Sequence, residues 1–374
     1  MRGRSARVAD GPHISSAQRA APRTGGEAAA TLAGSWLARG KGGRLTVYVP
    51  GDGGLLRWTE ARVGGPEWTG PEFFPMAGLT HLAVAQGADT YVHFLGRRER
   101  RRSEGHVEVD IVHAIQYQTG RPVTEWRSLG NPHKDQAKAS ALGVPAAAVD
   151  SRGTVFVFVR NGGGGLMLRR EQADGKWAAW QDLKGSRLAD GPVPAATSAG
   201  TVEVVVPTQR GVQEWRQSEA DGPLTAGQPM QMHSLPGSGT ALETAPGRVT
   251  YYWTDAGMSG TVAYRPGAWP VALGGAPGDG AIAALRAPLD GFDCTVLAQR
   301  GAGGTLLIGV CATEGEHNGV WWSDTMAECV GDPALAVDAY GRVVVAVLGP
   351  DGAARIARQE QGPGLTLSPR WHHL

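Results

Sequence analysis

The polar residues of this chain that are candidates for chemistry interrupt apolar segments and match no known catalytic motif. Glu243 breaks a segment of Ala, Leu and Thr, and Arg286 ends a similar Ala-rich segment 43 residues later. If these segments are neighbours in the fold, Glu243 and Arg286 meet as a carboxylate–guanidinium pair. The pair is then either a structural ion pair with trapped water or the polar part of a catalytic pocket.

A second set of candidates lies between residues 93 and 113. His93 stands in the apolar run YVHFL, and in Val107–His113 strand alternation places Asp110 and His113 on opposite faces. Imidazole and carboxylate groups serve both general acid–base catalysis and metal binding, so His93, Asp110 and His113 form the best such candidate in the chain. The alternative is that they are structural groups with local partners. No cofactor and no bound metal is predicted.

Glu203 is a further catalytic candidate because it is the one charged residue in an otherwise apolar run. The run reads VEVVV, which is typical of a middle strand that is covered on both faces. Burying an unpaired carboxylate in such a strand is costly. Glu203 therefore needs either a partner or a pocket.

Tryptophan supplies the candidate ligand-binding residues, since the chain contains 12 of them. Exposed aromatic faces stack on the apolar faces of sugar rings, so we single out five: Trp177, Trp215, Trp253, Trp321 and Trp322. The adjacent pair Trp321-Trp322 points to opposite faces if it lies in a strand. Three others recur in a W-x-x-L ending and are expected to pack between repeats: Trp126, Trp180 and Trp371.

A repeated β unit must position these residues. Apolar runs of about five residues begin at 45, 91, 155, 202, 249, 294 and 343, at intervals of 46, 64, 47, 47, 45 and 49 residues. A repeat of this length built from strands and turns is typical of a β-propeller. We therefore predict an all-β fold, a single seven-bladed β-propeller with four-stranded antiparallel blades over residues 31–374 and almost no helix.

The repeat frame makes two further predictions. The chain ends on a fourth strand, so the ring should close between blades 7 and 1 without a shared blade. The long interval predicts an insertion in blade 2 around residues 96–106. Its charged run GRRERRRSEG is either a solvated hairpin tip or an anion-binding loop.

Composition excludes several classes of protein. The 36 Lys and Arg against 35 Asp and Glu give a net charge of +1, which argues against nucleic-acid binding. No apolar run approaches the roughly 18 residues of a membrane helix, and three Cys without C-x-x-C spacing form no zinc motif.

The 31 Arg against 5 Lys are typical of GC-rich bacterial coding. Residues 1–30 lack the apolar segment of a signal peptide, which predicts a disordered leader and a cytoplasmic protein.

Blade 3 carries a resemblance to a known family. Residues 145–185 read PAAAVDSRGTVFVFVRNGGGGLMLRREQADGKWAAWQDLKG. This resembles the repeat of the seven-bladed PLL-type bacterial lectins, with matches at Trp177, Trp180, Leu183, Gly185, Pro145 and the run Val155 to Arg160. Blades 4 and 7 match more loosely, and the other blades match mainly by spacing. The resemblance implies binding of fucosylated or related glycans in clefts between neighbouring blades.

Three functions follow from these observations. The first is a lectin-like propeller that binds a glycan or other small-molecule ligand in inter-blade aromatic clefts. The second is a single-pocket hydrolase, lyase or cyclase of bacterial secondary metabolism, with its polar residues in the central channel or blade 2. The third is a protein-interaction scaffold. Similar Trp clefts in every blade would favour a multivalent lectin, whereas one deep polar pocket would favour an enzyme.

Overall fold

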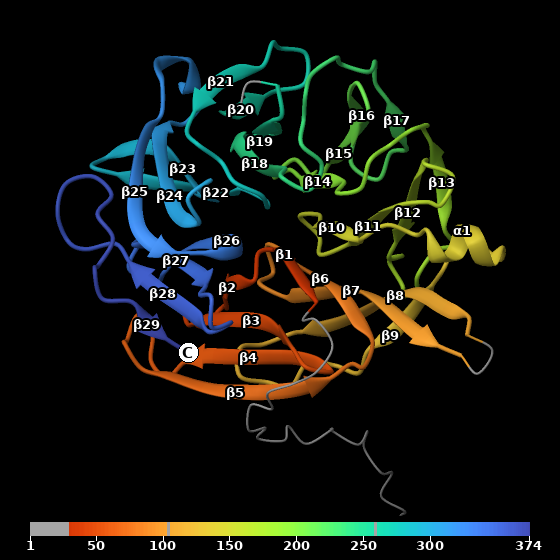
Figure 1. Cartoon of the computed structure of the whole chain (residues 1–374), viewed down its shortest axis with the longest axis horizontal. Helices are drawn as coiled ribbons and strands as arrows, with labels where there is room; N and C mark the ends of the chain where they lie inside the picture. The colour runs from red at the N-terminus through yellow and green to blue at the C-terminus, as the bar shows by residue number, and fades with distance from the viewer. Residues whose placement is uncertain (1–29, 103–104, 258–259) are drawn as a thin grey trace, which may run out of the picture.

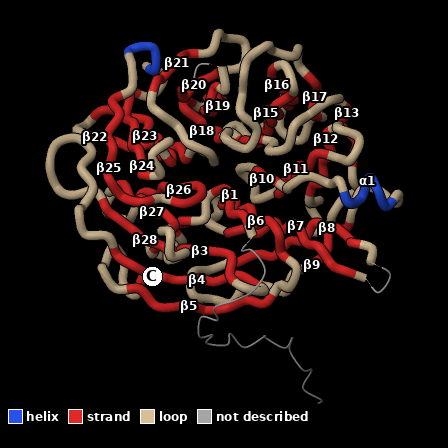
Figure 2. Tube along the Cα trace, in the orientation of Figure 1, coloured by secondary structure: helices blue, strands red, loops and turns tan. Residues whose placement is uncertain are grey.

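Seven sheets stand in a ring around a central channel (Figure 1). The computed structural model describes residues 30–102, 105–257 and 260–374. Within these ranges the helical structure is limited to α1 (Gln136–Ser140) and the 3₁₀ helix η1 (Glu316–Asn318), as Figure 2 shows. No helix in the described part of the chain has the length and apolar content needed to cross a membrane. The predicted all-β, seven-bladed propeller is confirmed.

Each blade consists of four consecutive antiparallel strands, ordered from the channel outward. The strands of blades 1 and 2 are β2 (Leu37–Arg39), β3 (Leu45–Gly51), β4 (Gly54–Glu60) and β5 (Trp68–Pro75), then β6 (Leu79–Gln86), β7 (Val92–Arg101), β8 (Val107–Gln116) and β9 (Arg127–Gly130). Those of blades 3 and 4 are β10 (Ala146–Val149), β11 (Val155–Arg160), β12 (Leu166–Arg170) and β13 (Gln181–Lys184), then β14 (Val193–Ala196), β15 (Val202–Thr208), β16 (Gly211–Gln217) and β17 (Leu224–Ala226).

The remaining three blades follow the same plan. Blade 5 contains β18 (Thr240–Ala245), β19 (Arg248–Asp255), β20 (Gly260–Tyr264) and β21 (Val271–Gly274). Blades 6 and 7 contain β22 (Ala283–Leu289), β23 (Phe292–Arg300), β24 (Thr305–Ala312) and β25 (Trp321–Glu328), then β26 (Val330–Val337), β27 (Val343–Leu348), β28 (Ala354–Arg358) and β29 (His372–His373). All four strands of blade 7 come from the C-terminal part of the chain, so the predicted closure without a shared blade is confirmed.

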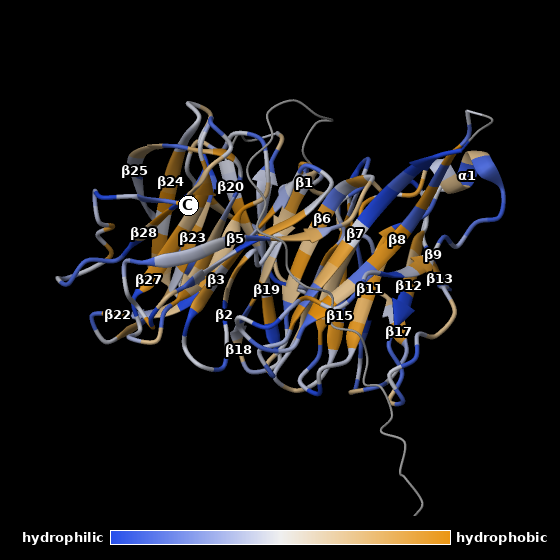
Figure 3. Ribbon diagram, turned by 90° about the horizontal axis from the view of Figure 1, so that it is seen from below, coloured by the Kyte–Doolittle hydropathy of each residue, from blue (hydrophilic) through white to orange (hydrophobic). Residues whose placement is uncertain are grey.

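The hydrophobic core lies between neighbouring blades. In β11, Val155, Val157 and Val159 pack toward blade 2, whereas Phe156 and Phe158 pack toward blade 4. Strand alternation causes this division, because successive side chains point to opposite faces of a sheet. Figure 3 shows the resulting apolar strands running through the thickness of the ring. Each junction between blades is therefore a separate packing environment.

The inner strand of blade 1 is split, which the sequence did not predict. An extra strand, β1 (Thr31–Gly34), leaves blade 1 and pairs in parallel with β6 of blade 2, so that blade 2 has five strands. The chain turns at Gly34, where φ is +79° and a Cβ would lie 2.2 Å from the carbonyl oxygen of Val84. Only glycine fits such a close backbone approach. Ser35 and Trp36 then lead into β2, beside β26 of blade 7.

Blade 2 also carries the long hairpin that the repeat spacing indicated. Gly96 to Arg101, expected as part of an insertion, continue β7 as strand, and β8 begins at Val107. Arg98 lies opposite Asp110 and Arg100 opposite Glu108, so the charged run pairs across the hairpin. Figure 3 shows this hydrophilic ribbon projecting from the edge of the ring. Residues 103 and 104 at its tip, and residues 1–29 of the expected leader, lie outside the described residues.

Candidate functional site

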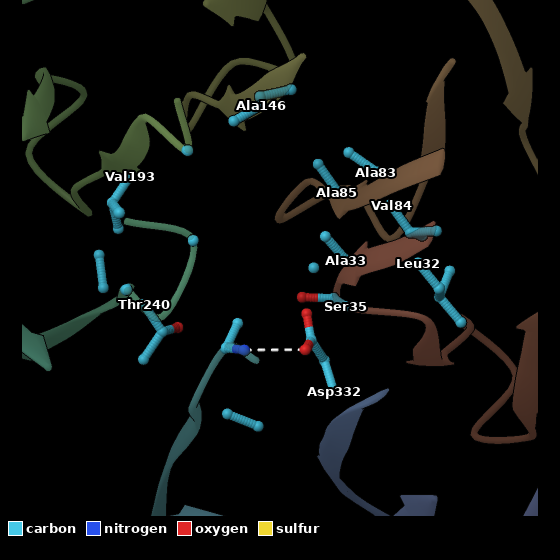
Figure 4. A pocket seen from close by; sticks show the side chains of 18 of the residues that line it. Leu32, Ala33, Ser35, Ala83, Val84, Ala85, Ala146, Val193, Thr240 and Asp332 are labelled. Atoms are coloured by element: carbon cyan, nitrogen blue, oxygen red, sulfur yellow. Dashed lines mark hydrogen bonds between the residues drawn. The ribbon is translucent and has the colours of Figure 1, made fainter. Parts of the chain in front are cut away.

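The inner strands enclose a cavity of about 920 Å³ on the propeller axis (Figure 4). Its wall consists mainly of Ala, Gly, Pro and Val from β1 and the inner strands of blades 2 to 7. Small side chains are needed there because the inner strands crowd around one axis. The polar side chains on the wall include His81, Asp190, Glu243 and Asp332.

The expected Glu243–Arg286 pair does not form. Glu243 accepts hydrogen bonds from the backbone N–H of Ser198 at 2.9 and 3.0 Å, from the Ser198 hydroxyl at 2.8 Å and from the N–H of Gly247 at 2.7 Å. Arg286 is exposed and forms a salt bridge with Asp293, across the hairpin of its own blade, at 2.5 Å. Glu243 thus braces the turn of blade 4, and each residue is satisfied locally. A catalytic role for either one stays a prediction.

His93 and His113 come together at the junction of blades 2 and 3, without Asp110. Nδ1 of His93 and Nε2 of His113 are 3.2 Å apart, so one nitrogen donates to the other, and the edge of Trp177 lies against His113 with ring centroids 5.1 Å apart. Burial lowers the pKa of His93 to about 4 and that of His113 to about 3. Both rings are therefore neutral near pH 7.

Asp110 faces the opposite side of β8. Its carboxylate binds the guanidinium group of Arg98 at 2.6 and 2.9 Å and accepts the Ser128 hydroxyl at 2.5 Å. The three residues therefore do not converge on one reacting atom. Within the described ranges, no three His, Cys, Asp or Glu side chains are grouped to hold a metal ion.

Glu203 has one partner in the next blade and one in its own blade. Tyr251 of blade 5 donates its hydroxyl to Glu203 Oε1 at 3.0 Å, and Nε of Arg216 lies 3.0 Å from Oε2. Burial raises the pKa of Glu203 above its usual value, and Arg216 opposes that effect. The carboxylate is thus part of a polar contact between blades 4 and 5.

Three of the five candidate tryptophans are structural contacts between blades. Trp215 is 1% exposed and donates its indole N–H to the Leu183 carbonyl of blade 3 at 3.0 Å. Trp322 makes the same kind of bond to Leu273 of blade 5 at 2.8 Å. Trp253 is 3% exposed and lies in the core between blades 4 and 5, with Val205 and Val212 of blade 4. Trp177 is half-buried beside His113, which leaves Trp321 as the one open face among the five.

Trp321 has an exposed neighbour that the sequence analysis missed. Trp321 is 81% exposed at the start of β25, and Trp269 is 87% exposed in the turn before β21. Trp269 and Trp321 thus precede or begin the outermost strands of the neighbouring blades 5 and 6, which the Trp322–Leu273 bond links, and strand alternation turns the Trp321 ring to the face of β25 opposite that of Trp322. The helix η1 comes shortly before Trp321 in the chain and packs against β21, and Figure 2 shows it near the β21 label. The sequence PGAWP, with Pro on both sides of Trp269, was the available signal for an exposed turn.

A partly buried polar network joins η1 and the residues before it to blade 5. Glu316 of η1 is 2% exposed, forms an ion pair with Arg265 and accepts the hydroxyl of Tyr252 at 3.1 Å. Glu314, two residues earlier, pairs with Arg248 and accepts the Thr244 hydroxyl at 3.0 Å. Carboxylate–guanidinium bonds of this kind are charge-assisted and hold the groups in fixed orientations. The turn that ends at Trp321 is therefore anchored to blade 5.

Exposed polar side chains complete the surface of this junction. His317 and Asn318 of η1 are exposed, and they precede Trp321 by four and three residues. They offer hydrogen-bond donors and acceptors close in the chain to the exposed ring of Trp321. We call the surface formed by Trp269, Trp321, His317 and Asn318 the blade 5–6 rim.

Comparison with known proteins finds solved structures of similar fold. No known family matches the chain, and no curated protein matches its sequence. The Hadza microbial sialidase Hz136 shares 14% identity with a TM-score of 0.50, over 78% of this chain and 71% of that one. AofleA from Arthrobotrys oligospora shares 12% sequence identity with a TM-score of 0.51, and the match covers 78% of this chain and 86% of that one. An ulvan lyase bound to -[GlcA(1-4)Rha3S]- shares 12% sequence identity with a TM-score of 0.56, and the match covers 86% of this chain and 94% of that one. At these identities the likeness shows a common propeller fold.

Proposed function

We propose that this propeller binds carbohydrate at the blade 5–6 rim. The observation that carries the proposal is the pair of exposed indoles, Trp269 and Trp321, at the starts of the outermost strands of neighbouring blades 5 and 6. Large exposed aromatic side chains on a folded protein mark interaction sites when they gather in one place. The proposal thus keeps the predicted inter-blade aromatic clefts but limits them to one junction, that of blades 5 and 6.

The chemistry of a sugar fits this arrangement. A pyranose ring has an apolar face of C–H groups, which packs on an aromatic ring, and a rim of hydroxyls, which both donate and accept hydrogen bonds. At the blade 5–6 rim the two indoles supply the flat faces. His317 and Asn318 supply polar groups at the edge, and the buried Glu316–Arg265 pair keeps their turn in one position. Such preorganisation lowers the entropic cost of binding.

The names of the similar structures support carbohydrate as the ligand class. One is a sialidase and another is a polysaccharide lyase bound to -[GlcA(1-4)Rha3S]-. The enzyme alternative has less support in this chain, because Glu243, Arg286 and Asp110 each have local partners. A single rim, rather than seven similar clefts, indicates one principal binding site.

A glycan array followed by titration calorimetry tests the proposal. The purified protein should bind at least one glycan class, and the double variant Trp269→Ala/Trp321→Ala should weaken that binding at least tenfold, which corresponds to about 1.4 kcal/mol. A matched control is Phe292→Ala/Tyr340→Ala, which removes two exposed aromatic rings from hairpin tips of blades 6 and 7. Absence of binding to any glycan, or equal losses in both double variants, would overturn the proposal.

A further inference from the structure

The central channel contains a carboxylate with one oxygen that has no partner. Asp332 lies in β26 between Val330 and Ala334, where the register with β27 shifts. Its Oδ1 accepts the backbone N–H of Ala281 at 2.8 Å, whereas its Oδ2 accepts no hydrogen bond from the described residues. The Trp36 indole donates to the Asp332 carbonyl at 3.2 Å and fixes the backbone. The free oxygen is therefore held on the wall of the cavity.

Asp190 shows what the same kind of aspartate does when both oxygens are used. It lies just before the inner strand of blade 4 and caps blade 3, as Asp332 caps blade 6. Its two oxygens accept the N–H of Val144 at 3.1 and 3.3 Å, and Oδ1 also accepts the N–H of Gly191 at 3.1 Å. Capping of the neighbouring strand accounts for both oxygens of Asp190 but for only one oxygen of Asp332.

A second irregularity of the ring, the break between β1 and β2, lies on the same side of the cavity as Asp332. Ser35 stands at the break between β1 and β2, where the inner strand of blade 1 leaves its own sheet. It is exposed, lines the cavity, and its hydroxyl makes no hydrogen bond within the described part of the chain. Figure 4 shows Ser35 and Asp332 on the same side of the cavity, with Ala33 and Ala85 nearby. Two oxygens without a hydrogen-bond partner among the described residues thus lie on the same side of the cavity.

The charge of the wall has one sign. Its described lining residues include the carboxylates of Asp190, Glu243 and Asp332 and no Lys or Arg, although the chain contains 36 of these two cationic residues. The one imidazole on the wall, His81, bonds to the Thr31 hydroxyl at 2.6 Å, and burial lowers its pKa to about 4. Burial also raises the pKa of Asp332 to about 6, so a cation beside it would relieve a desolvation cost.

We propose that the central channel binds a linear aliphatic amine, with its ammonium group at Asp332 Oδ2 and the Ser35 hydroxyl and its alkyl chain along the Ala-lined wall. An ammonium group has three donors, which suits two oxygen acceptors. The cavity volume is within the range of small-molecule pockets.

The lining residues also argue against other cations. No Phe, Tyr or Trp ring lines the described cavity, and cages of such rings are what quaternary ammonium groups prefer. Ca²⁺ requires six or more oxygen ligands, and the two free oxygens here are too few.

Titration calorimetry with n-octylamine at pH 7.5 tests this proposal on the full chain. We expect saturable binding of octylamine, with octanoate and tetramethylammonium at least tenfold weaker. Asp332→Asn keeps the Oδ1 acceptor for Ala281 and removes the charge, so octylamine should bind at least tenfold more weakly to it. The matched control, Asp190→Asn, should change binding less than threefold, since that side chain is fully used in capping.

Two results would overturn the channel site. One is equal binding of octylamine and octanoate, which would show an apolar cavity with no preference for a cation. The other is equal affinity of Asp332→Asn and the unmodified protein, with both variants shown to be folded by circular dichroism and thermal unfolding. The channel and the blade 5–6 rim are separate surfaces, so glycan binding and amine binding can each fail without affecting the other.

Discussion

The same kind of tether, a hydrogen bond from a tryptophan indole to a backbone carbonyl of the preceding blade, links blades 3 and 4 and also blades 5 and 6. The two junctions differ in whether they also carry exposed tryptophans. At the first, Trp215 is buried among Phe156, Phe158 and their neighbours and donates to Leu183. At the second, Trp322 donates to Leu273 in the same way. Only the second junction adds a buried Glu316–Arg265 pair and leaves two indoles, Trp269 and Trp321, in water.

The comparison separates structural from binding roles for the same residue type. An indole N–H that is bonded to a carbonyl of the preceding blade satisfies its one polar atom, and its ring can be buried at little cost. Trp321 and Trp269 make no such bond in the described structure, and burial does not explain their presence. Exposure, rather than the number of tryptophans, therefore supports the proposed binding surface.

The largest effect should come from removing the buried tether. Trp215→Ala deletes a fully buried ring and leaves the Leu183 carbonyl without its donor, so we expect a loss of about 3–5 kcal/mol in the free energy of unfolding. Trp321→Ala should change that free energy by less than about 0.5 kcal/mol, because its ring is already in water. Urea unfolding of both variants measures the difference. Equal losses would show that exposure does not separate the two roles.

The buried ion pair should have the next largest effect. Glu316→Ala leaves the Arg265 guanidinium and the Tyr252 hydroxyl without their acceptor, and we expect about 2–3 kcal/mol of destabilisation, since Arg265 retains some access to water. Glu316→Gln keeps an acceptor for Tyr252 and should lose less. Urea unfolding at fixed pH gives both values. A glutamine variant as unstable as the alanine variant would show that the charge carries the whole effect.

A third junction, between blades 2 and 3, extends the comparison to pH. Burial holds the pKa of His93 at about 4 and that of His113 at about 3, below the ordinary value of 6.5. The unfolded chain therefore binds more protons below pH 6.5, and this stabilising contribution, complete above pH 6.5, is lost as the pH falls toward 4.

Unfolding measurements between pH 7 and 5 test this linkage. Each histidine contributes a slope of up to about 1.4 kcal/mol per pH unit, so the two together should lose about 3–4 kcal/mol over this range. His113→Phe keeps a flat ring beside Trp177 and removes one titrating group, so its pH slope should be smaller. An unchanged slope in that variant would assign the acid sensitivity to other groups, such as His81.

The sequence predicted the ring but not the places where the ring departs from its repeat. Strand periodicity and turn residues recur in every blade, so the spacing of the apolar runs was enough to count the blades. The split at Gly34 depends on one close approach to Val84, and the bulge that presents Asp332 depends on the register between β26 and β27. Neither contact leaves a repeated pattern in the chain.

The site residues show the same limit. Glu243 and Arg286 occupy the inner strands of adjacent blades, as predicted, yet their side chains select nearer partners in Ser198 and Asp293. Side-chain direction decides such pairings, and one unaligned sequence does not specify it. Trp321 could be predicted as a surface residue from its alternation with Trp322, whereas Trp269 required attention to a single Pro-flanked turn.

The smallest effect should come from the charged hairpin, where the chemistry of the Glu316 pair recurs in water. Arg100 and Glu108 are 3.1 Å apart on opposite strands, and both are well exposed. Water screens their attraction, and ordering two long side chains costs entropy, so Glu108→Gln should lower the free energy of unfolding by less than about 0.5 kcal/mol. Added salt should remove even this difference, whereas it should leave most of the Glu316→Gln effect, because a buried pair is screened much less. Urea unfolding of the two glutamine variants at low and high salt makes the measurement. A loss in Glu108→Gln as large and as insensitive to salt as that in Glu316→Gln would mean that the ion pair itself, and not its removal from water, stabilises the junction of blades 5 and 6.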